Sequence, residues 1–282
     1  MPDPSPESLR SCPPDPSPES LRSCPPDPSN LGLKDRVFLV TGGGRGVGAG
    51  ISAVFAAQGA TVVTCARRPV EGSPYEFHSC DIRDPDAVGG LIDGIVGRHR
   101  RLDVVVNNAG GSPYAPAAEA SPRFHQKVIE LNLLGMFYVS LAANAVMQQQ
   151  AHGGSIISIS SVSGRRPSPG TAAYGAAKAG VDSLTATLAV EWAPKVRVNA
   201  VVAGMVATEQ AELFYGDGDS QAAVAATVPL GRLARPDEIG WAAAFLASDL
   251  ASYISGATLP VHGGGESPAF LSASSANTKE TR

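Results

Sequence analysis

The chain has 282 residues, of which 43% are hydrophobic and 17% charged, and its formal net charge is −4. This length and composition fit a globular protein with a large core and exclude a wholly disordered chain. Lysine and arginine never occur in runs longer than two and aromatic residues make up only 6%, so we expect no nucleic-acid partner. The sequence contains no run of about 18 uninterrupted apolar residues, so we expect no membrane span.

The chain begins with a tandem repeat. Pro2 to Pro13 reads PDPSPESLRSCP, and Pro14 to Pro25 repeats it letter for letter. A proline-rich segment with so few apolar side chains cannot offset its ordering entropy by burial. We therefore predict a disordered extension over residues 1–30, a single domain over residues 31–266 and a flexible tail over residues 267–282.

The four cysteines, at positions 12, 24, 65 and 80, predict neither disulfides nor a metal site. They form no C-x-x-C pair and have no metal-ligand spacing with the five histidines. The first residues contain no apolar stretch of the kind that a secretory signal needs. We therefore expect a cytoplasmic protein in which Cys65 and Cys80 are small buried side chains.

Between the two ends, β-rich apolar runs alternate with helical patterns. We predict strands at Arg36–Thr41, Ala60–Cys65, Tyr75–Cys80, Leu102–Asn107, Ser155–Ser160, Val196–Val202 and Gly256–Val261. We predict helices at Val47–Gln58, Pro85–Arg98, Phe124–Gln150, Ala172–Trp192 and Pro236–Ala247. The alternation predicts an α/β fold: a Rossmann-like, doubly wound parallel sheet of about seven strands with helices on both faces. Ligands of such sheets bind beyond the carboxyl ends of the strands.

The first predicted strand runs into a glycine-rich turn that opens a helix. The turn reads Thr41-Gly42-Gly43-Gly44-Arg45-Gly46-Val47-Gly48. Glycines let the backbone turn tightly and let a diphosphate approach the free N–H groups of the helix. A glycine-rich turn is also an ordinary connection, but its place after the first strand of an alternating chain favours dinucleotide binding.

The second strand is followed by arginines where an NAD-binding protein would place an acid. Arg67 and Arg68 stand there, no acid follows before Glu71, and Arg45 adds a third guanidinium. Guanidinium groups bind a 2′-phosphate bidentately, so we expect NADP(H) to be favoured over NAD(H). The alternative is a solvated turn with incidental arginines.

The third and fourth strands end in further candidate cofactor contacts. Asp81, followed by Ile82, either accepts a hydrogen bond from an adenine amino group or caps the next helix. Asn108, Ala109 and Gly110 are small or polar, so the backbone there allows close approach of a ribose or forms a tight turn.

The fifth predicted strand leads to the candidate catalytic residues. It ends at Ser161, and thirteen residues later Tyr174 and Lys178 stand four positions apart in a predicted helix, so they share a face. An isolated Tyr-x-x-x-Lys pair is often only a solvated face. The serine-ended strand and the preceding phosphate-binding turn favour a Ser-Tyr-Lys site.

With these motifs in order, the chain over Leu31 to Gly265 resembles the short-chain dehydrogenase/reductase family. The shared motifs are TGGGRGVG at 41–48, NNAG at 107–110, Asn132 within LNLLG, Ser161, YGAAK at 174–178, VRVNAVVAGMVAT at 196–208 and PLGRLARPDEI at 229–239. Ala203 departs from the usual proline before Gly204, and His262 from the usual aspartate before the closing glycines.

The resemblance implies a catalytic tetrad of Asn132, Ser161, Tyr174 and Lys178. It also implies that Thr208 holds a nicotinamide carboxamide beside Gly204 and Val206, that Tyr174 and Lys178 contact the cofactor, and that Asn132 anchors a water molecule. A homotetramer or homodimer is expected on the same ground.

The expected mechanism needs a more acidic phenol. Tyrosine has a reference pKa of ~10, and lowering it by three units needs about 4 kcal/mol. An ammonium group ~4 Å away at an effective dielectric of ~20 supplies roughly that much, so we expect Lys178 to lower the pKa of Tyr174 against the opposing effect of burial.

The expected substrate is a small ketone or secondary alcohol under the segment Met205–Val228. Leu213, Phe214 and Tyr215 favour an apolar alicyclic, steroid-like or fatty-acyl compound, and residues 216–219 suit a mobile lid tip. Two alternatives are a 3-oxoacyl-thioester reductase and a non-catalytic NADP-binding regulator.

Overall fold

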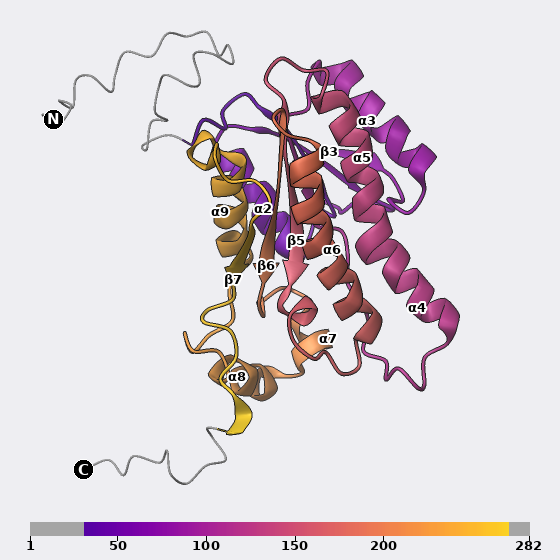
Figure 1. Ribbon diagram of the computed structural model, residues 1–282. Coiled ribbons are helices and arrows are strands. Elements are labelled where there is room, and N and C mark those ends of the chain that lie inside the picture. Colours follow the sequence, from indigo (N-terminus) through magenta and orange to yellow (C-terminus); the bar gives the residue numbers. More distant parts are fainter. Residues whose placement is uncertain (1–30, 271–282) are drawn as a thin grey trace, which may run out of the picture.

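The computed structural model describes residues 31–270 (Figure 1). The extension predicted over residues 1–30, with Cys12 and Cys24, and residues 271–282 of the predicted tail lie outside the described residues. Ser267 donates its N–H to the carbonyl oxygen of Thr227 at 3.1 Å, so the chain is still attached to the domain just beyond residue 266.

The centre of the fold is one parallel sheet of seven strands, as predicted. Its order is β3-β2-β1-β4-β5-β6-β7, and every neighbouring pair is parallel. The strands are β1 Val37–Thr41, β2 Thr61–Ala66, β3 Glu76–Ser79, β4 Val104–Asn107, β5 Gly154–Ser161, β6 Val196–Ala203 and β7 Thr258–Val261. The strand order reverses between β1 and β4, which opens a crevice at their carboxyl ends, where such sheets bind ligands.

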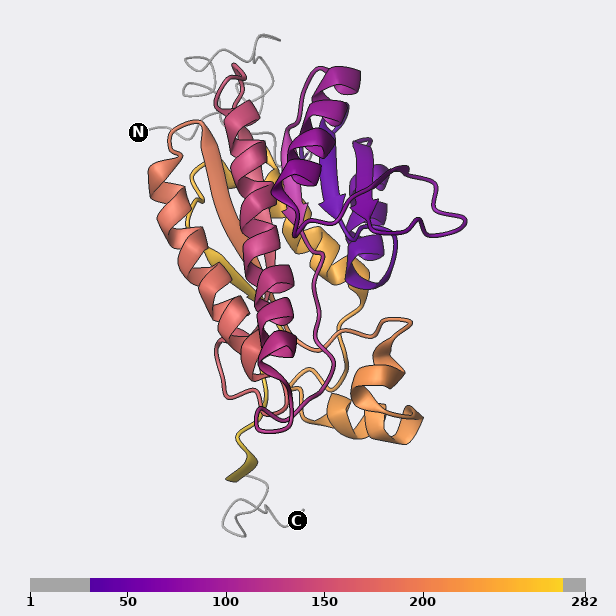
Figure 2. The same cartoon turned by 90° about the vertical axis from the view of Figure 1, so that its right-hand side faces the viewer.

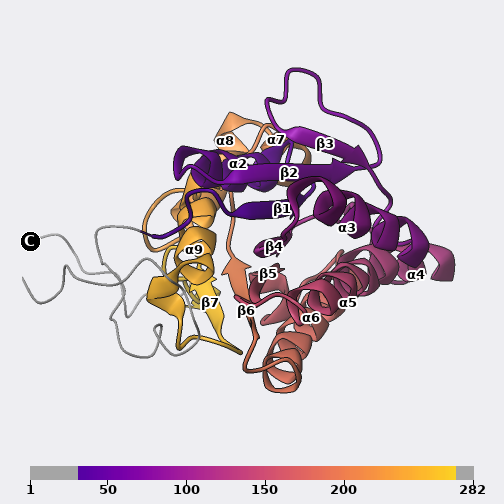
Figure 3. The same cartoon turned by 90° about the horizontal axis from the view of Figure 1, so that it is seen from above.

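Helices cover both faces of the sheet (Figure 3). The helices α2 Gly46–Ala57 and α9 Pro236–Ala247 lie on one face, where Phe38 and Phe55 stack with ring centroids 4.4 Å apart. The helices α3 Pro85–His99, α5 Gly135–Met147 and α6 Ala172–Glu191 cover the other face. Two continuous apolar layers result, which explains why β4 has three consecutive valines before Asn107.

The longest helical stretch is interrupted at its middle. Helix α4 Pro122–Ile129 passes through one π-helical turn, η2 Glu130–Leu134, into α5, so the predicted helix at 124–150 starts earlier and ends earlier than expected. The continuous helix 122–147 is long and apolar enough to cross a membrane by length and composition. Its α5 part packs Val139, Ala143 and Met147 into the core beside the sheet, as a core helix does.

Two helices that the sequence analysis did not predict follow β6. They are α7 Ala211–Tyr215 and α8 Gly218–Ala226, and they lie beyond the carboxyl ends of the strands (Figures 1 and 2). The lid tip predicted at 216–219 forms the turn between these two helices and the first residues of α8, and its mobility stays a prediction. Gly216 turns the chain at φ 82°, and Asp217 caps α8 by accepting the N–H of Ser220.

Helix α3 is capped by Asp84, which accepts the N–H groups of Asp86 and Ala87. The suggestion that Asp81 caps this helix is therefore wrong, because the capping carboxylate stands three residues later, directly before Pro85. Cys65 and Cys80 are buried thiols, as predicted, and burial raises the pKa of Cys65 to about 12, so this thiol stays protonated.

Candidate functional site

A cavity of about 1170 Å³ opens at the carboxyl ends of the strands, where the two halves of the sheet diverge. Nearly all residues proposed from the sequence line it. They are Gly42, Gly44, Arg45, Gly46, Val47, Gly48, Arg67, Arg68, Asp81, Ile82, Asn108, Ala109, Gly110, Ser161, Tyr174, Lys178, Gly204, Val206 and Thr208. Thr41 and Asn132 lie behind the wall and are completely buried.

The glycine turn is so closely packed that side chains do not fit in it. A Cβ on Gly48 would lie 2.2 Å from the carbonyl oxygen of Gly42, and Gly42 itself has φ 66°. Asn108 ties the turn to β4, because its Nδ2 donates to the carbonyl oxygens of Thr41 and Gly42 at 3.0 and 3.3 Å. The backbone of the turn is thus fixed in place and carries no side chains at its glycines, so a diphosphate can approach its N–H groups closely.

Thr41 is the second support of the turn. Its Oγ1 accepts the N–H groups of Asn108 and Ala109, both at 3.0 Å. These bonds join the ends of β1 and β4, the two strands between which the sheet order reverses. Thr41 therefore acts from behind the cavity wall and has no direct access to a ligand.

The N-terminus of α2 already binds an anion. Both carboxylate oxygens of Glu209 accept the N–H of Gly46, at 2.9 and 3.1 Å. Free N–H groups at a helix N-terminus attract negative charge, and a phosphate oxygen has the same requirement as this carboxylate. The glycine turn therefore fits the diphosphate of a dinucleotide, which would replace Glu209 there.

The three arginines proposed for a 2′-phosphate line the same cavity. Arg45, Arg67 and Arg68 are all exposed, so they are free of the desolvation cost that a buried cation bears. Asp81 lies close to them, and its carboxylate is bound by Arg83, which lowers the pKa of Asp81, with Arg67 contributing. The contact of Asp81 with an adenine stays a prediction.

Asn132 lies on the π-helical turn η2. Its Oδ1 accepts the N–H of Gly111 at 2.8 Å, and its Nδ2 donates to the carbonyl oxygens of Gly111 and Val128. Single π-turns often occur at functional sites, and here the wider turn places the amide against the strand-end loop after β4. The side chain of Asn132 thus fixes the floor of the cavity, and its water molecule stays a prediction.

Ser161, Tyr174 and Lys178 meet at the centre of the cavity. Ser161 acts on the phenol of Tyr174 and lowers its pKa, although burial raises that pKa by more. Lys178 lies 5.6 Å from the centre of the Tyr174 ring, and its Nζ donates to the carbonyl oxygen of Ile159 at 2.8 Å. The spacing of the sequence motif therefore brings these three residues together as predicted.

The electrostatics of this group differ from the expectation. Burial raises the pKa of Tyr174, and Lys178 is not among the groups that lower it. Burial also lowers the pKa of Lys178 to about 7, against a smaller opposing effect of Asp182. The predicted acidification of the phenol by Lys178 is therefore wrong for this state, because a buried ammonium group loses its own charge before it can act on its neighbour.

The part of the cavity beyond Tyr174 is more polar than the sequence predicted. Phe214 and Tyr215 line it, but Leu213 is 79% exposed and is not among the lining residues. Arg166 also lines it, from the loop between β5 and α6, and the sequence analysis missed this residue. The available signal was its place in the chain, because a segment that joins Ser161 to Tyr174 must border the same cavity.

The two departures from the family pattern lie together at the ends of β6 and β7. A Cβ on Gly204 would lie 2.7 Å from Cβ of His262, and Gly204 donates its N–H to Val261 at 3.0 Å. Ala203 is buried at the end of β6. His262 is thus packed against the backbone of the cavity wall and is not one of the lining residues.

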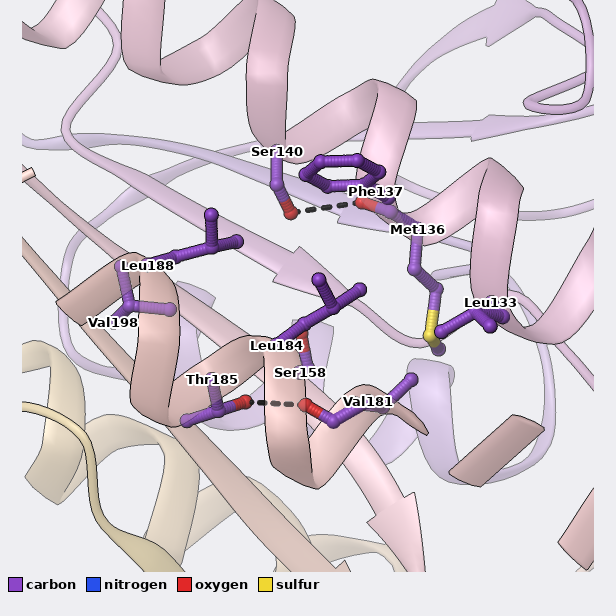
Figure 4. Close-up of a pocket in the computed structure, with 10 residues that line it drawn as sticks. All are labelled: Leu133, Met136, Phe137, Ser140, Ser158, Val181, Leu184, Thr185, Leu188 and Val198. Carbon is purple, nitrogen blue, oxygen red and sulfur yellow. Dashed lines mark hydrogen bonds between the residues drawn. The ribbon is translucent and has the colours of Figure 1, made fainter. Parts of the chain in front are cut away.

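A second cavity lies inside the domain, between α5, α6 and the sheet (Figure 4). Its volume is about 10 Å³, and it is enclosed mainly by apolar side chains such as Met136 and Val181. The hydroxyl groups of Ser140 and Thr185 beside it are bonded to carbonyl oxygens of their own helices. It has room for about one water molecule and none for a substrate.

Comparisons with known proteins agree with this geometry. A family model described as enoyl-(acyl carrier protein) reductase matches residues 42–266. The cis-4-hydroxycyclohexanecarboxylate dehydrogenase of Sinomonas cyclohexanicum is 38% identical over 82% of this chain and 96% of that protein. The 3beta-hydroxysteroid dehydrogenase 1 of Eggerthella lenta is 35% identical over 82% and 94%. The ligand-free structure of Thermoplasma acidophilum aldohexose dehydrogenase superposes with a TM-score of 0.79 at 33% identity, over 82% of this chain and 94% of the other. The chain therefore belongs to the short-chain dehydrogenase/reductase family of oxidoreductases.

Proposed function

We propose that the protein is an NADP(H)-dependent oxidoreductase that interconverts a secondary alcohol and a ketone on a ring compound. The observation that carries the proposal is that Ser161, Tyr174 and Lys178 line the same cavity as the glycine turn. The ring compound is favoured because the relatives named above act on a hydroxycyclohexane acid, a hydroxysteroid and an aldohexose by their names.

The side chains of the site have distinct tasks in this reaction. A reduced nicotinamide, when bound in this cavity, would supply the hydride for the carbonyl carbon. Tyr174 gives its hydroxyl proton to the carbonyl oxygen, and Ser161 donates a hydrogen bond to the same oxygen. Because burial raises the pKa of Tyr174, its phenol is protonated at neutral pH and is ready to act as the acid in ketone reduction. Lys178 is within reach of the ring and restores the proton when its own amine is protonated.

Replacement of the phenol tests the role of Tyr174. We expect Tyr174→Phe to lower kcat at least about a hundredfold, because general acid catalysis contributes ~10²–10⁴ in rate. Binding of NADPH, followed by its fluorescence, should stay within threefold of the wild type. Activity within about tenfold of the wild type would contradict this assignment.

The preference for NADP(H) rests on Arg45, Arg67 and Arg68 at the edge of the cavity. We expect Arg67→Asp to weaken NADPH binding at least about tenfold more than NADH binding, because a charge-assisted bidentate bond is lost and a repulsive charge is added. Arg98→Asp, on the far end of α3, is the control for a change of net charge. An unchanged ratio of the two dissociation constants in Arg67→Asp would refute the assignment.

Two alternatives have direct tests. The description of the matched family model refers to an acyl-carrier-protein substrate, so acetoacetyl-CoA with NADPH tests for thioester reduction. A non-catalytic NADP-binding regulator would show cofactor binding but no turnover of any ketone; the presence of all four tetrad residues opposes it. A homotetramer or homodimer is proposed as well, with light scattering as the measurement.

A further inference from the structure

Arg166 is a cation of the substrate side of the cavity that the reaction itself does not require. It stands five residues after Ser161 and eight before Tyr174, and it lines the same cavity as both. Its side chain is 39% exposed, so the guanidinium is open to the cavity and is not part of the core. A cation on the wall of a substrate compartment needs an anion to compensate it.

The compensating anion in this structure is the protein's own carboxylate. Glu266 lies 100 residues further along the chain, and its Oε1 accepts from Nη2 of Arg166 at 2.6 Å. The other terminal nitrogen, Nη1, donates to the carbonyl oxygen of Pro167. Glu266 itself is reached by no other cation among the described salt bridges. Its carboxylate therefore has one partner among the described salt bridges, Arg166, and another carboxylate can take its place there.

Tyr215 connects this cation to the reacting group. Burial raises the pKa of Tyr215 and the positive charge of Arg166 opposes that rise, while Tyr215 adds to the rise in the pKa of Tyr174. Arg166, Tyr174 and Tyr215 all line the cavity, so the guanidinium, the proton donor and the aromatic ring border one compartment. A compound with its carbonyl group at Tyr174 and an acid at Arg166 would lie within this compartment.

We infer that the substrate carries a carboxylate remote from its alcohol or ketone carbon, and that Arg166 binds this carboxylate in place of Glu266. A carboxylate fits better than a phosphate, because the site offers one guanidinium and is already filled by a carboxylate. The earlier expectation of a purely apolar substrate was based on the segment 205–228 alone, and Arg166 comes from a different loop. The inference rests on the proposed function, since it assumes ketone reduction at Tyr174.

The test compares two ketones that differ in charge alone. The ketones are 4-oxocyclohexanecarboxylate and 4-oxocyclohexanecarboxamide, each assayed with NADPH for kcat/KM. For the wild type we expect the carboxylate to exceed the amide by about tenfold or more, with most of the difference in KM, as for a lost charged contact. If neither ketone is reduced while other ketones are, the ring or the acid position is wrong. If no ketone is reduced at all, the proposed function fails instead.

Two variants separate substrate binding from a structural tether. Arg166→Met should lower kcat/KM for the carboxylate at least about tenfold more than for the amide, so that the preference is lost. Glu266→Gln should instead raise kcat/KM for the carboxylate about two- to fivefold, because the competing charge is removed while the side chain stays the same size. Effects of opposite sign are expected, since Arg166 binds the carboxylate of the substrate and Glu266 competes with that carboxylate for Arg166.

The contrary outcome is equally specific. If the ion pair only attaches the chain near residue 266 to the domain, both variants break the pair and lower kcat/KM for both ketones by the same factor. That result would overturn the inference. Arg165→Met is the matched control, because Arg165 pairs with Asp182 and does not line the cavity. The preference for the carboxylate should be the same in Arg165→Met as in the wild type, and an equal loss there would also overturn it.

Discussion

The buried ammonium group of Lys178 makes the stability of the domain depend on pH in a way that a single variant isolates. Burial lowers the pKa of Lys178 from 10.5 to about 7 in the folded state. The side chain is 3% exposed. In the unfolded chain it regains its ordinary pKa, so between pH 7 and 10 the unfolded state binds one more proton than the folded state. The free energy of unfolding therefore rises with pH through this range.

The size of the effect follows from the two pKa values. With a folded-state pKa of about 7, the contribution of Lys178 grows by about 1.3 kcal/mol between pH 6 and 8 and by about 2.7 kcal/mol between pH 6 and 9. The slope approaches about 1.4 kcal/mol per pH unit. Lys178→Met removes this titration and keeps nearly the same side-chain length. The difference in stability between wild type and variant should rise with pH by these amounts.

The assay is urea unfolding followed by circular dichroism at pH 6, 7, 8 and 9. Other groups, such as Cys65 with its raised pKa, titrate alike in both proteins, so they cancel in the difference. The range ends at pH 9 because Tyr174, which adjoins Lys178, begins to ionise in the unfolded chain above it. A difference that stays constant within about 0.5 kcal/mol from pH 6 to 9 would refute the reasoning, since it would mean that the ammonium stays charged in the folded protein.

Two further predictions concern the glycine turn. Glu209→Gln should strengthen NADP⁺ binding about two- to fivefold by calorimetry, because a competing charge worth ~0.5–1 kcal/mol is removed from the N-terminus of α2. Glu212→Gln, on α7, is the control. Binding of NADP⁺ to Glu209→Gln that is equal to or weaker than that of the wild type would contradict the competition. Gly48→Ala should lower the unfolding free energy by about 1–3 kcal/mol, because its Cβ would meet the carbonyl oxygen of Gly42 at 2.2 Å. Gly90→Ala, on α3 with nothing within 4 Å of its Cβ, should instead raise the unfolding free energy by about 0.5–1 kcal/mol. Similar changes of the unfolding free energy in the two variants would show that the glycine turn can shift to accept a side chain at position 48.

The chain order of motifs was enough to predict the fold and most of the cavity wall. Each of the seven strands lies within about two residues of its predicted bounds. Central strands such as β1 are recognisable because a strand buried on both faces is a run of apolar residues. The predicted site residues follow these strand ends, and parallel strands bring their carboxyl ends to one edge. Tyr174 and Lys178 needed only helical periodicity to meet.

Features that depend on segments distant in sequence were not predictable in this way. The helices α7 and α8 are too short to show a clear periodic pattern, and most helical stability comes from tertiary packing. The contact of Glu209 with Gly46 joins residues 163 positions apart, and that of Arg166 with Glu266 joins residues 100 apart. Local pattern says nothing about such pairs.

The sequence by itself determined which groups stand at the edge of the sheet, because strand and helix periodicity are local properties of the chain. Only the tertiary structure decided their state of charge, because desolvation depends on everything packed around a group. Lys178 has its ordinary pKa as an amino acid and loses its charge near neutral pH only when Ile159, Met136 and their neighbours enclose it.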